Sequence, residues 1–201
     1  MKKNFLLIAM AVCTFVMISC KKESIEQPQA TYAPTAQNKA TVQNVQNGPG
    51  VVTGRTGITV CDPVTVTLIA GQTINSGTVT VTNDADFIYV TYATTNGWVL
   101  TQTHLYVGDC ALIPVNNPGN PIPGQFPYAG SHSNITSYTY QVPISQIPLG
   151  GCGCIAAHAV VKQLDANNQV IQTQTAWGQG TLINLSGGNW GMKFEYCSCS
   201  L

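Results

Sequence analysis

The feature that most constrains this chain is an alternation of apolar and polar residues with a period of two, which begins near Ile58. Valine or leucine alternates with threonine in the segments 64–68 and 78–82, and tyrosine, valine and isoleucine alternate with polar residues or proline in the segment 138–144. Successive side chains of a β-strand point to opposite faces, so this pattern predicts strands with one buried and one exposed face. No segment shows a capped pattern with the 3.6-residue period of a helix.

Further apolar runs extend this pattern along the chain. They predict strands at 87–94, 98–107, 155–164, 170–177 and 190–199, separated by the turn-forming pairs Asn83-Asp84, Asn96-Gly97, Asn167-Asn168 and Gly187-Gly188. The run 155–164 is rich enough in alanine to be helical on propensity alone, but its valines and the Asp-Ala-Asn-Asn turn after it favour a strand. We therefore predict an all-β domain over residues 57–201, an antiparallel β-sandwich of about eight or nine strands.

The charge of this region argues against binding to nucleic acid. From Ile58 onward the chain has two lysines and six carboxylates, a net charge of minus four. Affinity for nucleic acid depends on clustered Lys and Arg that neutralise phosphates. We therefore expect no nucleic-acid partner.

An export signal precedes the domain. Lys2 and Lys3 are followed by an apolar run from Phe5 to Ser19, and 15 residues are too few to span a bilayer as a helix. The run ends Met17-Ile18-Ser19-Cys20, which resembles a bacterial lipobox, although Met17 replaces the usual leucine. We expect residues 1–19 to be a lipoprotein signal peptide and Cys20 to be lipidated, which makes the membrane a partner; cleavage elsewhere, with Cys20 unmodified, is the alternative.

The segment 20–56 has the composition of a flexible tether. After Cys20 it contains five glutamines, one aromatic residue and no hydrophobic period, so it cannot bury enough apolar surface to offset chain entropy. Lys21-Lys22-Glu23 resembles the charged tag of Bacteroidetes-type lipoproteins that are moved to the outer face of the outer membrane. We therefore expect a lipid-anchored, surface-exposed protein of the outer membrane, held on a tether that provides reach or acts only as a passive spacer.

Four motifs occur in order within the predicted domain: Thr103-His104-Leu105, the segment 119–128 (GNPIPGQFPY), the segment 155–161 (IAAHAVV) and Thr175-Ala176-Trp177-Gly178. Together they resemble a recurrent secreted β-domain of bacterial surface lipoproteins. The resemblance covers most of residues 64–196. It implies a surface-exposed β-sandwich module without catalytic residues, and it does not extend to the cysteines.

Six cysteines remain after Cys13 is assigned to the signal and Cys20 to the lipid. They are Cys61, Cys110, Cys152, Cys154, Cys197 and Cys199. An even number in an exported chain predicts disulfides, and six cysteines permit 15 pairings. Both Cys-x-Cys pairs place two sulfurs on one strand face, so two neighbouring strands could be linked twice; a zinc or copper site built from four thiolates is the alternative.

Three histidines allow two interpretations. If their strands pair, His104 and His158 could meet and, with a carboxylate such as Asp109, form a metal or acid–base site. We favour the alternative that both are core histidines, and we expect His132, in a Gly-Ser loop, to be solvated. The sequence therefore predicts no metal and no cofactor.

The sequence contains no convincing set of catalytic residues. Asp84 and Asp86 flank a predicted hairpin tip, where such residues serve the turn itself; an alternative role is calcium binding, for which one tip supplies too few oxygens. We find no phosphate-binding glycine loop, no Ser-His-Asp order and no zinc-hydrolase helix. We therefore expect that the protein is not an enzyme.

The remaining candidates are aromatic residues at strand ends and in one long loop. Trp98, Trp177 and Trp190 could stack on sugar rings, but we expect at least two of them to cap the core instead. The predicted loop 114–132 contains five prolines, and its aromatic residues Phe126 and Tyr128 either contact a ligand or fasten the loop to the domain. We predict a non-catalytic binding module for a carbohydrate or another surface ligand, and alternatively a scaffold that binds other proteins of the envelope.

Overall fold

The structure is a computed structural model that describes residues 61–147 and 149–199. The predicted signal peptide, the lipidated Cys20 and the tether lie outside these residues. Ten strands make up the fold: β1 (Val64–Ala70), β2 (Ile74–Asn83), β3 (Phe87–Thr94), β4 (Trp98–Gly108), β5 (Tyr128–Ile135), β6 (Ser137–Pro143), β7 (Cys152–Leu164), β8 (Val170–Gly178), β9 (Thr181–Leu182) and β10 (Met192–Cys197). Three short 3-10 helices connect them: η1 (Cys110–Leu112), η2 (Pro123–Gln125) and η3 (Ile144–Gln146).

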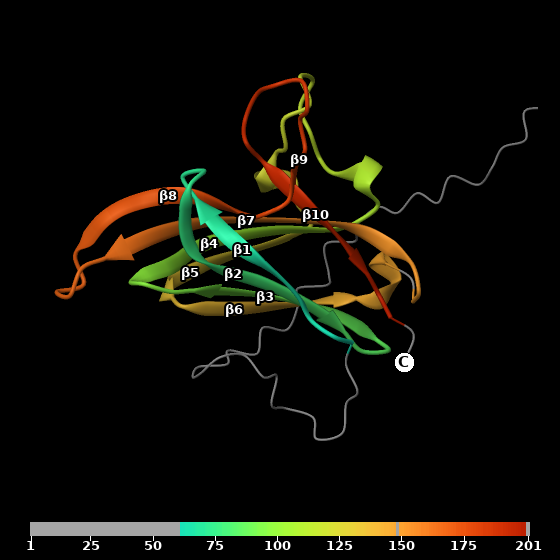
Figure 1. Cartoon of the computed structure of the whole chain (residues 1–201), viewed down its shortest axis with the longest axis horizontal. Helices are drawn as coiled ribbons and strands as arrows, with labels where there is room; N and C mark the ends of the chain where they lie inside the picture. The colour runs from blue at the N-terminus through green and yellow to red at the C-terminus, as the bar shows by residue number, and fades with distance from the viewer. Residues whose placement is uncertain (1–60, 148, 200–201) are drawn as a thin grey trace, which may run out of the picture. The chain divides into compact units, whose positions relative to one another are not determined.

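The strands pair antiparallel in one continuous sheet (Figure 1). Its order is β5-β4-β7-β8-β1-β2-β3-β6, and β10 pairs with the first residues of β7, beyond the point where β8 departs toward β1. The predicted all-β antiparallel class is confirmed. Within that class the strands join in a single sheet that curls partly into a barrel, instead of lying in two separately paired layers.

The two edge strands of the main path meet because they follow each other in the chain. Only Thr136 separates β5 from β6, and its carbonyl accepts a hydrogen bond from the amide of Thr94. The imidazole of His132 on β5 lies 4.3 Å from the ring of Tyr138 on β6, centroid to centroid. These contacts curl the sheet around a common interior.

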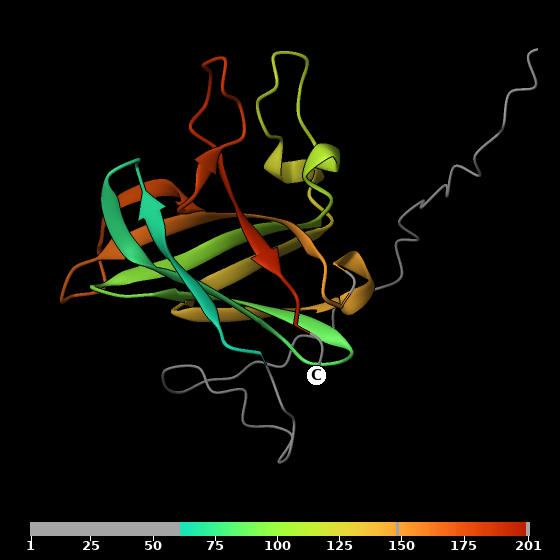
Figure 2. The same cartoon turned by 45° about the vertical axis from the view of Figure 1, so that its right-hand side comes forward.

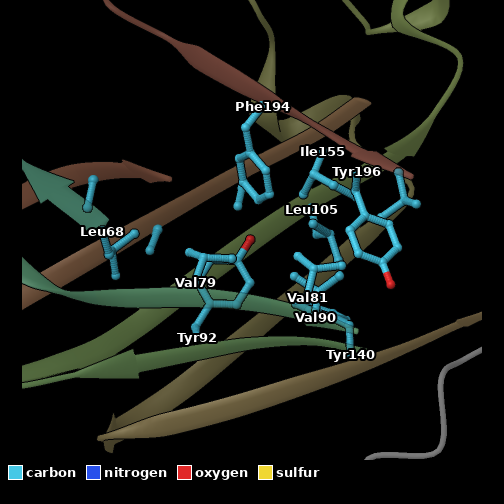
Figure 3. Packing of buried hydrophobic residues seen from close by; sticks show 14 of the residues in the cluster. Leu68, Val79, Val81, Val90, Tyr92, Leu105, Tyr140, Ile155, Phe194 and Tyr196 are labelled. Carbon is cyan, nitrogen blue, oxygen red and sulfur yellow. The ribbon is translucent and has the colours of Figure 1, made fainter. Parts of the chain in front are cut away.

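The interior of the curl contains the main hydrophobic core. Alternate residues of most strands point inward, and Phe194 and Tyr196 of β10 complete the core (Figure 3). The labelled members of this core are Leu68, Val79, Val81, Val90, Tyr92, Leu105, Tyr140, Ile155, Phe194 and Tyr196. Burial of each large aliphatic side chain stabilises the fold by roughly 1.5–3 kcal/mol, so this interior dominates stability.

Several predicted turns and strands are confirmed. Asn96 and Gly97 lie in the turn that connects β3 to β4, with φ values of 55° and 78°, a left-handed conformation that asparagine and glycine adopt more readily than other residues. Asn168, with φ of 61°, lies in the turn between β7 and β8. The alanine-rich run is strand β7, as the valines and the following turn indicated.

One strand lies where the sequence predicted a loop. The segment Tyr128–Ile135 forms β5, although it contains Gly130 and several polar residues and most of its side chains are exposed or half-buried. Its backbone pairs with β4, for example Ala129 with His104. An edge strand of this kind obtains its stability from main-chain hydrogen bonds, so side-chain hydrophobicity gives little sign of it.

All six cysteines of the domain form disulfides, as predicted. The pairs are Cys61–Cys199, Cys110–Cys154 and Cys152–Cys197. Only Cys152–Cys197 links β7 to β10, so the two Cys-x-Cys pairs do not link these strands twice and do not form a four-thiolate metal site. Cys61–Cys199 joins the two ends of the domain, while Cys110–Cys154 joins η1 to β7.

Candidate functional site

Strands β4 and β7 are buried on both faces, which sets them apart from an ordinary half-buried pair. Their inward residues join the main core, and their outward residues lie in a second cluster, here called the outer-face cluster. It consists of Tyr106, Ile113, Phe126, Cys154, Ala156 and Trp177, with Ile183, Trp190 and Met192 packed against it. The register places His104 opposite His158, and His158 opposite Trp177, so one row of side chains crosses three strands beside this cluster.

Two loops cover the outer-face cluster. They are residues 113–127 and 183–191, here called the loop pair, and they stand side by side in both views (Figures 1 and 2). Phe126 is 5% exposed, and its ring meets Tyr106 and Trp177 edge to face at centroid distances of 6.1 and 6.2 Å. Aromatic pairs in this geometry add about 0.5–1.5 kcal/mol beyond burial. Phe126 therefore fastens the first loop to the sheet.

Asparagine amides hold the two loops together. The amide nitrogen of Asn184 donates to the carbonyl of Pro118 at 2.7 Å and to Oδ1 of Asn120 at 2.9 Å. The same Oδ1 accepts from the backbone amide of Asn189 at 3.0 Å. Asn184 is itself buried, so these bonds form away from bulk water and are costly to break. The loop pair is consequently one connected surface.

A close backbone approach adds to this connection. Gly191, at the end of the second loop, is buried, and a Cβ built there would lie 2.3 Å from Cγ of Pro121 in the first loop. The same Cβ would lie 3.1 Å from the ring of Trp177. Glycine is therefore required at this position by the packing of the loops.

The pairing of His104 with His158 is the predicted meeting of two imidazoles. Their Nδ1 atoms are 3.3 Å apart, and the indole of Trp177 meets the His158 ring at a centroid distance of 4.8 Å. Burial, and secondarily the neighbouring His104, lowers the pKa of His158 to about 3, and burial also lowers the pKa of His104. Both rings are therefore neutral at pH 7. The carboxylate that the sequence suggested as a third member is elsewhere, because Asp109 caps η1 by accepting from the Ala111 amide.

Two of the three tryptophans pack in the buried interior, as we expected for at least two of them. Trp98 is 2% exposed within the main core and Trp177 is 4% exposed in the outer-face cluster, so neither presents a ring face to solvent. Trp190 is half-buried at the base of the second loop. It is the only one of the three whose ring is partly open to a ligand.

The predicted contact loop is shorter and more ordered than the sequence suggested. Residues 128–132 belong to β5, and Val115 forms a bridge with Pro121 within the remaining loop. Tyr128 is half-buried on β5, with its ring 6.1 Å from that of Tyr140, centroid to centroid. Both aromatic residues of the predicted loop thus occupy fastening positions.

The expectation of a solvated His132 is wrong. The residue lies on β5, is half-buried, and its Nε2 forms a 2.8 Å hydrogen bond with Oγ1 of Thr103. Burial lowers the pKa of its imidazole. The residues around His132 are polar, so the sequence gives little sign that they form strand β5. That strand places the imidazole of His132 against the ring of Tyr138.

The acidic hairpin tip serves the turn, which was the interpretation that the sequence favoured. Oδ1 of Asp84 accepts from the amides of Asp86 and Phe87, and its Oδ2 accepts from the hydroxyl of Tyr89. Within residues 61–147 and 149–199, no group of three or more His, Cys, Asp or Glu side chains is placed to hold a metal ion.

Sequence reasoning missed the asparagines of the loop pair as functional candidates. Asn120, Asn184 and Asn189 lie in loops rich in Gly, Asn and Pro, which predicts turns but does not tell which turns meet. Residues 120 and 184 come together only through the topology of the sheet, which a local sequence pattern does not reveal.

Comparison with known proteins gives no relative: no family model, no curated protein and no solved structure matches the chain. The described part of the chain also contains no helix that is long and apolar enough to cross a membrane.

Proposed function

We propose that this protein is a lipid-anchored lipoprotein of the outer membrane that displays a non-catalytic binding surface on its loop pair. The observation that carries the proposal is the hydrogen bonding of Asn184 to the first loop, which makes one preorganised surface from two distant segments. A surface that is already ordered loses less entropy when it binds, so more of the contact energy appears as affinity.

The position of the loop pair supports this proposal. In both views the two loops extend from the side opposite to the end where β1 begins and the C-terminus lies (Figures 1 and 2). Because β1 begins at that far end, the loops lie at the opposite end of the domain from the strand that follows the predicted tether. A ligand that approaches the loop pair therefore does not meet the end of the domain where the tether joins it.

The side chains of the loop pair suit a carbohydrate ligand. Asn117 is an exposed amide, which can donate to and accept from hydroxyl groups, and the half-buried Trp190 offers part of an aromatic face. Carbohydrate recognition is therefore the first function to test. Exposed aliphatic residues favour the alternative, a scaffold that binds proteins: Leu185 is 85% exposed on the second loop and Val115 is 44% exposed on the first.

A glycan array, probed with the full chain and with two loop variants, separates these functions. Trp190→Ala should abolish retention on specific glycans, whereas Leu185→Ser should weaken binding to envelope proteins and leave glycan retention unchanged. Ile171→Ser is the matched control, because Ile171 is a 61% exposed aliphatic residue on β8, outside the loop pair. Glycan binding that survives Trp190→Ala would exclude the loop pair as the sugar site, and the absence of any glycan binding would favour the scaffold.

The anchor has its own test. In a Gram-negative host, labelled fatty acid should be incorporated into the wild-type chain and into Cys13→Ala, but not into Cys20→Ala, which should leave the membrane fraction. A wild-type chain that never acquires the label would contradict the lipoprotein proposal and leave the binding surface untouched.

A further inference from the structure

The two sulfurs of the Cys110–Cys154 disulfide have different environments. Cys110 begins η1 and is exposed, whereas Cys154 on β7 is 3% exposed within the outer-face cluster. A thiol in solution can therefore approach Cys110 but not Cys154. Thiol–disulfide exchange depends on which sulfur the attacking thiolate reaches, so exchange at this disulfide begins at Cys110.

A cation lies next to the buried sulfur. Nζ of Lys193 on β10 donates a hydrogen bond to Sγ of Cys154 at 3.5 Å. The sulfur of an intact disulfide is neutral, so the ammonium group interacts with it only weakly. The same contact becomes a charge-assisted hydrogen bond when Cys154 carries a negative charge. Lys193 therefore stabilises Cys154 as a departing thiolate more than it stabilises the disulfide.

Two carboxylates near the disulfide act on exchange in the opposite sense. Glu195 is the register partner of Cys154, but its side chain is exposed, so water screens its charge more than that of the half-buried Lys193 in direct contact with the sulfur. Asp109 precedes Cys110 and is also exposed. Its negative charge lies beside the sulfur that a thiol reaches first, where it disfavours the approach of an anionic thiol.

We infer that the Cys110–Cys154 disulfide is a thiol-exchange site for small cationic or neutral thiols. The thiol loses its proton to solvent, and its sulfur forms a bond to Sγ of Cys110 as the bond between Cys110 and Cys154 breaks. The electron pair of that bond leaves on Sγ of Cys154, beside the Lys193 ammonium. The thiol sulfur is oxidised and Cys154 is reduced, which leaves a mixed disulfide on Cys110 and releases η1 from β7. The inference does not depend on the proposed function.

The other two disulfides lack this combination of access and charge. Cys61 is buried and Cys199 is half-buried, so a thiol reaches that disulfide least easily. Cys152 and Cys197 are both exposed, but Lys193 contacts Cys154 instead of either of them. Access alone favours exchange at Cys152–Cys197, whereas a stabilised leaving group favours exchange at Cys110–Cys154. The order in which the disulfides react therefore tests the inference.

The experiment exposes the oxidised full chain to cysteamine, a cationic thiol, and traps free thiols with N-ethylmaleimide before peptide mapping by mass spectrometry. We expect the first product to carry cysteamine on Cys110 and the maleimide on Cys154. Lys193→Gln should slow this step at least about fivefold, the factor that corresponds to two unit charges about 4 Å apart in water. Lys162→Gln is the matched control, because Lys162 lies near the opposite end of β7.

Exchange at the other two disulfides of the same molecules shows whether Lys193→Gln has disturbed the fold, because partial unfolding would accelerate all three reactions. First exchange at Cys152–Cys197, cysteamine on Cys154, or equal rates for Lys193→Gln and the wild type would overturn the inference.

A series of thiols tests the charge preference. Each rate is divided by the rate of that thiol with a small reference disulfide, which removes differences in intrinsic reactivity. Cysteamine should then react several-fold faster than the anionic 2-mercaptoethanesulfonate, and Asp109→Asn should narrow this ratio while its side-chain oxygen can still cap η1. Equal rates for the two thiols in the wild type would contradict the preference for cationic or neutral thiols.

Discussion

The main core and the outer-face cluster lie on opposite faces of the same two strands, β4 and β7, yet they are assembled in different ways. The main core collects alternate side chains of nearly every strand, so regular pairing is enough to bring its members together. The outer-face cluster needs Phe126, Ile113 and the loop pair, which come from irregular segments. The first region stabilises the fold, and the second builds a rigid surface that the fold does not require.

This difference predicts that a substitution can change the stability of the whole domain without releasing the loop pair, or release the loop pair without unfolding the domain. Damage to the interior should lower the melting temperature of the whole domain. Damage to the loops should release them while the curled sheet persists, as expected where stability is not uniform across a structure.

The largest expected effect comes from the disulfide that joins the ends of the domain. Cys61 and Cys199 are 138 residues apart, and Cys110 and Cys154 are 44 apart. The chain-entropy relation gives upper values of about 5 and about 4 kcal/mol for these two bridges. Urea unfolding of the double alanine variants should show the larger loss for Cys61–Cys199.

The two bridges should also differ in what their loss exposes. Loss of Cys110–Cys154 should make the loop pair sensitive to protease, because Cys154 belongs to the outer-face cluster. Protease resistance of the loops in that variant would contradict the division into two regions.

The second prediction compares one residue from each region. Leu105→Ala should lower the free energy of global unfolding by about 2–5 kcal/mol, because Leu105 is fully buried in the main core. Phe126→Ala should lower it less, because the loss is confined to the loops. Under native conditions limited proteolysis should cut residues 113–127 only in Phe126→Ala. If Leu105→Ala is cut there equally, the loop pair is part of the main core and the comparison fails.

The smallest expected effect concerns pH and His158. Its pKa is about 3 in the folded protein, against about 6.5 in an unfolded chain. As the pH falls, the unfolded state binds a proton on His158 before the folded state does. The contribution of the neutral, buried His158 to stability is therefore complete above pH 6.5 and decreases below it. Between pH 7 and pH 5 the free energy of unfolding should fall by about 2 kcal/mol.

Chemical denaturation at both pH values measures this change. His158→Asn should remove most of the difference. If the stability of the wild type is constant over this interval, the folded state binds the proton on His158 as readily as the unfolded state, and its pKa is not lowered by folding.

Much of the fold could be predicted from the sequence, because its signals are local. The alternation of valine with threonine places β1 and β2, and Asn96-Gly97 marks the turn between β3 and β4, where residues that tolerate positive φ are favoured. The oxidised cysteines also followed from their even number in an exported chain. Strand β5 escaped this reasoning because its stability resides in the backbone, and Gly130 and His132 resemble loop residues.

The sequence by itself determined most of the segments that form strands, where most of the turns fall, and that the cysteines are paired. Only the tertiary structure decided which cysteine meets which, that Asn184 contacts the loop of Asn120, and that His104 lies opposite His158. The physical reason is the range of the forces involved. Side-chain periodicity and turn conformation are properties of a few neighbouring residues, whereas cross-strand and loop contacts depend on the register and curl of the whole sheet.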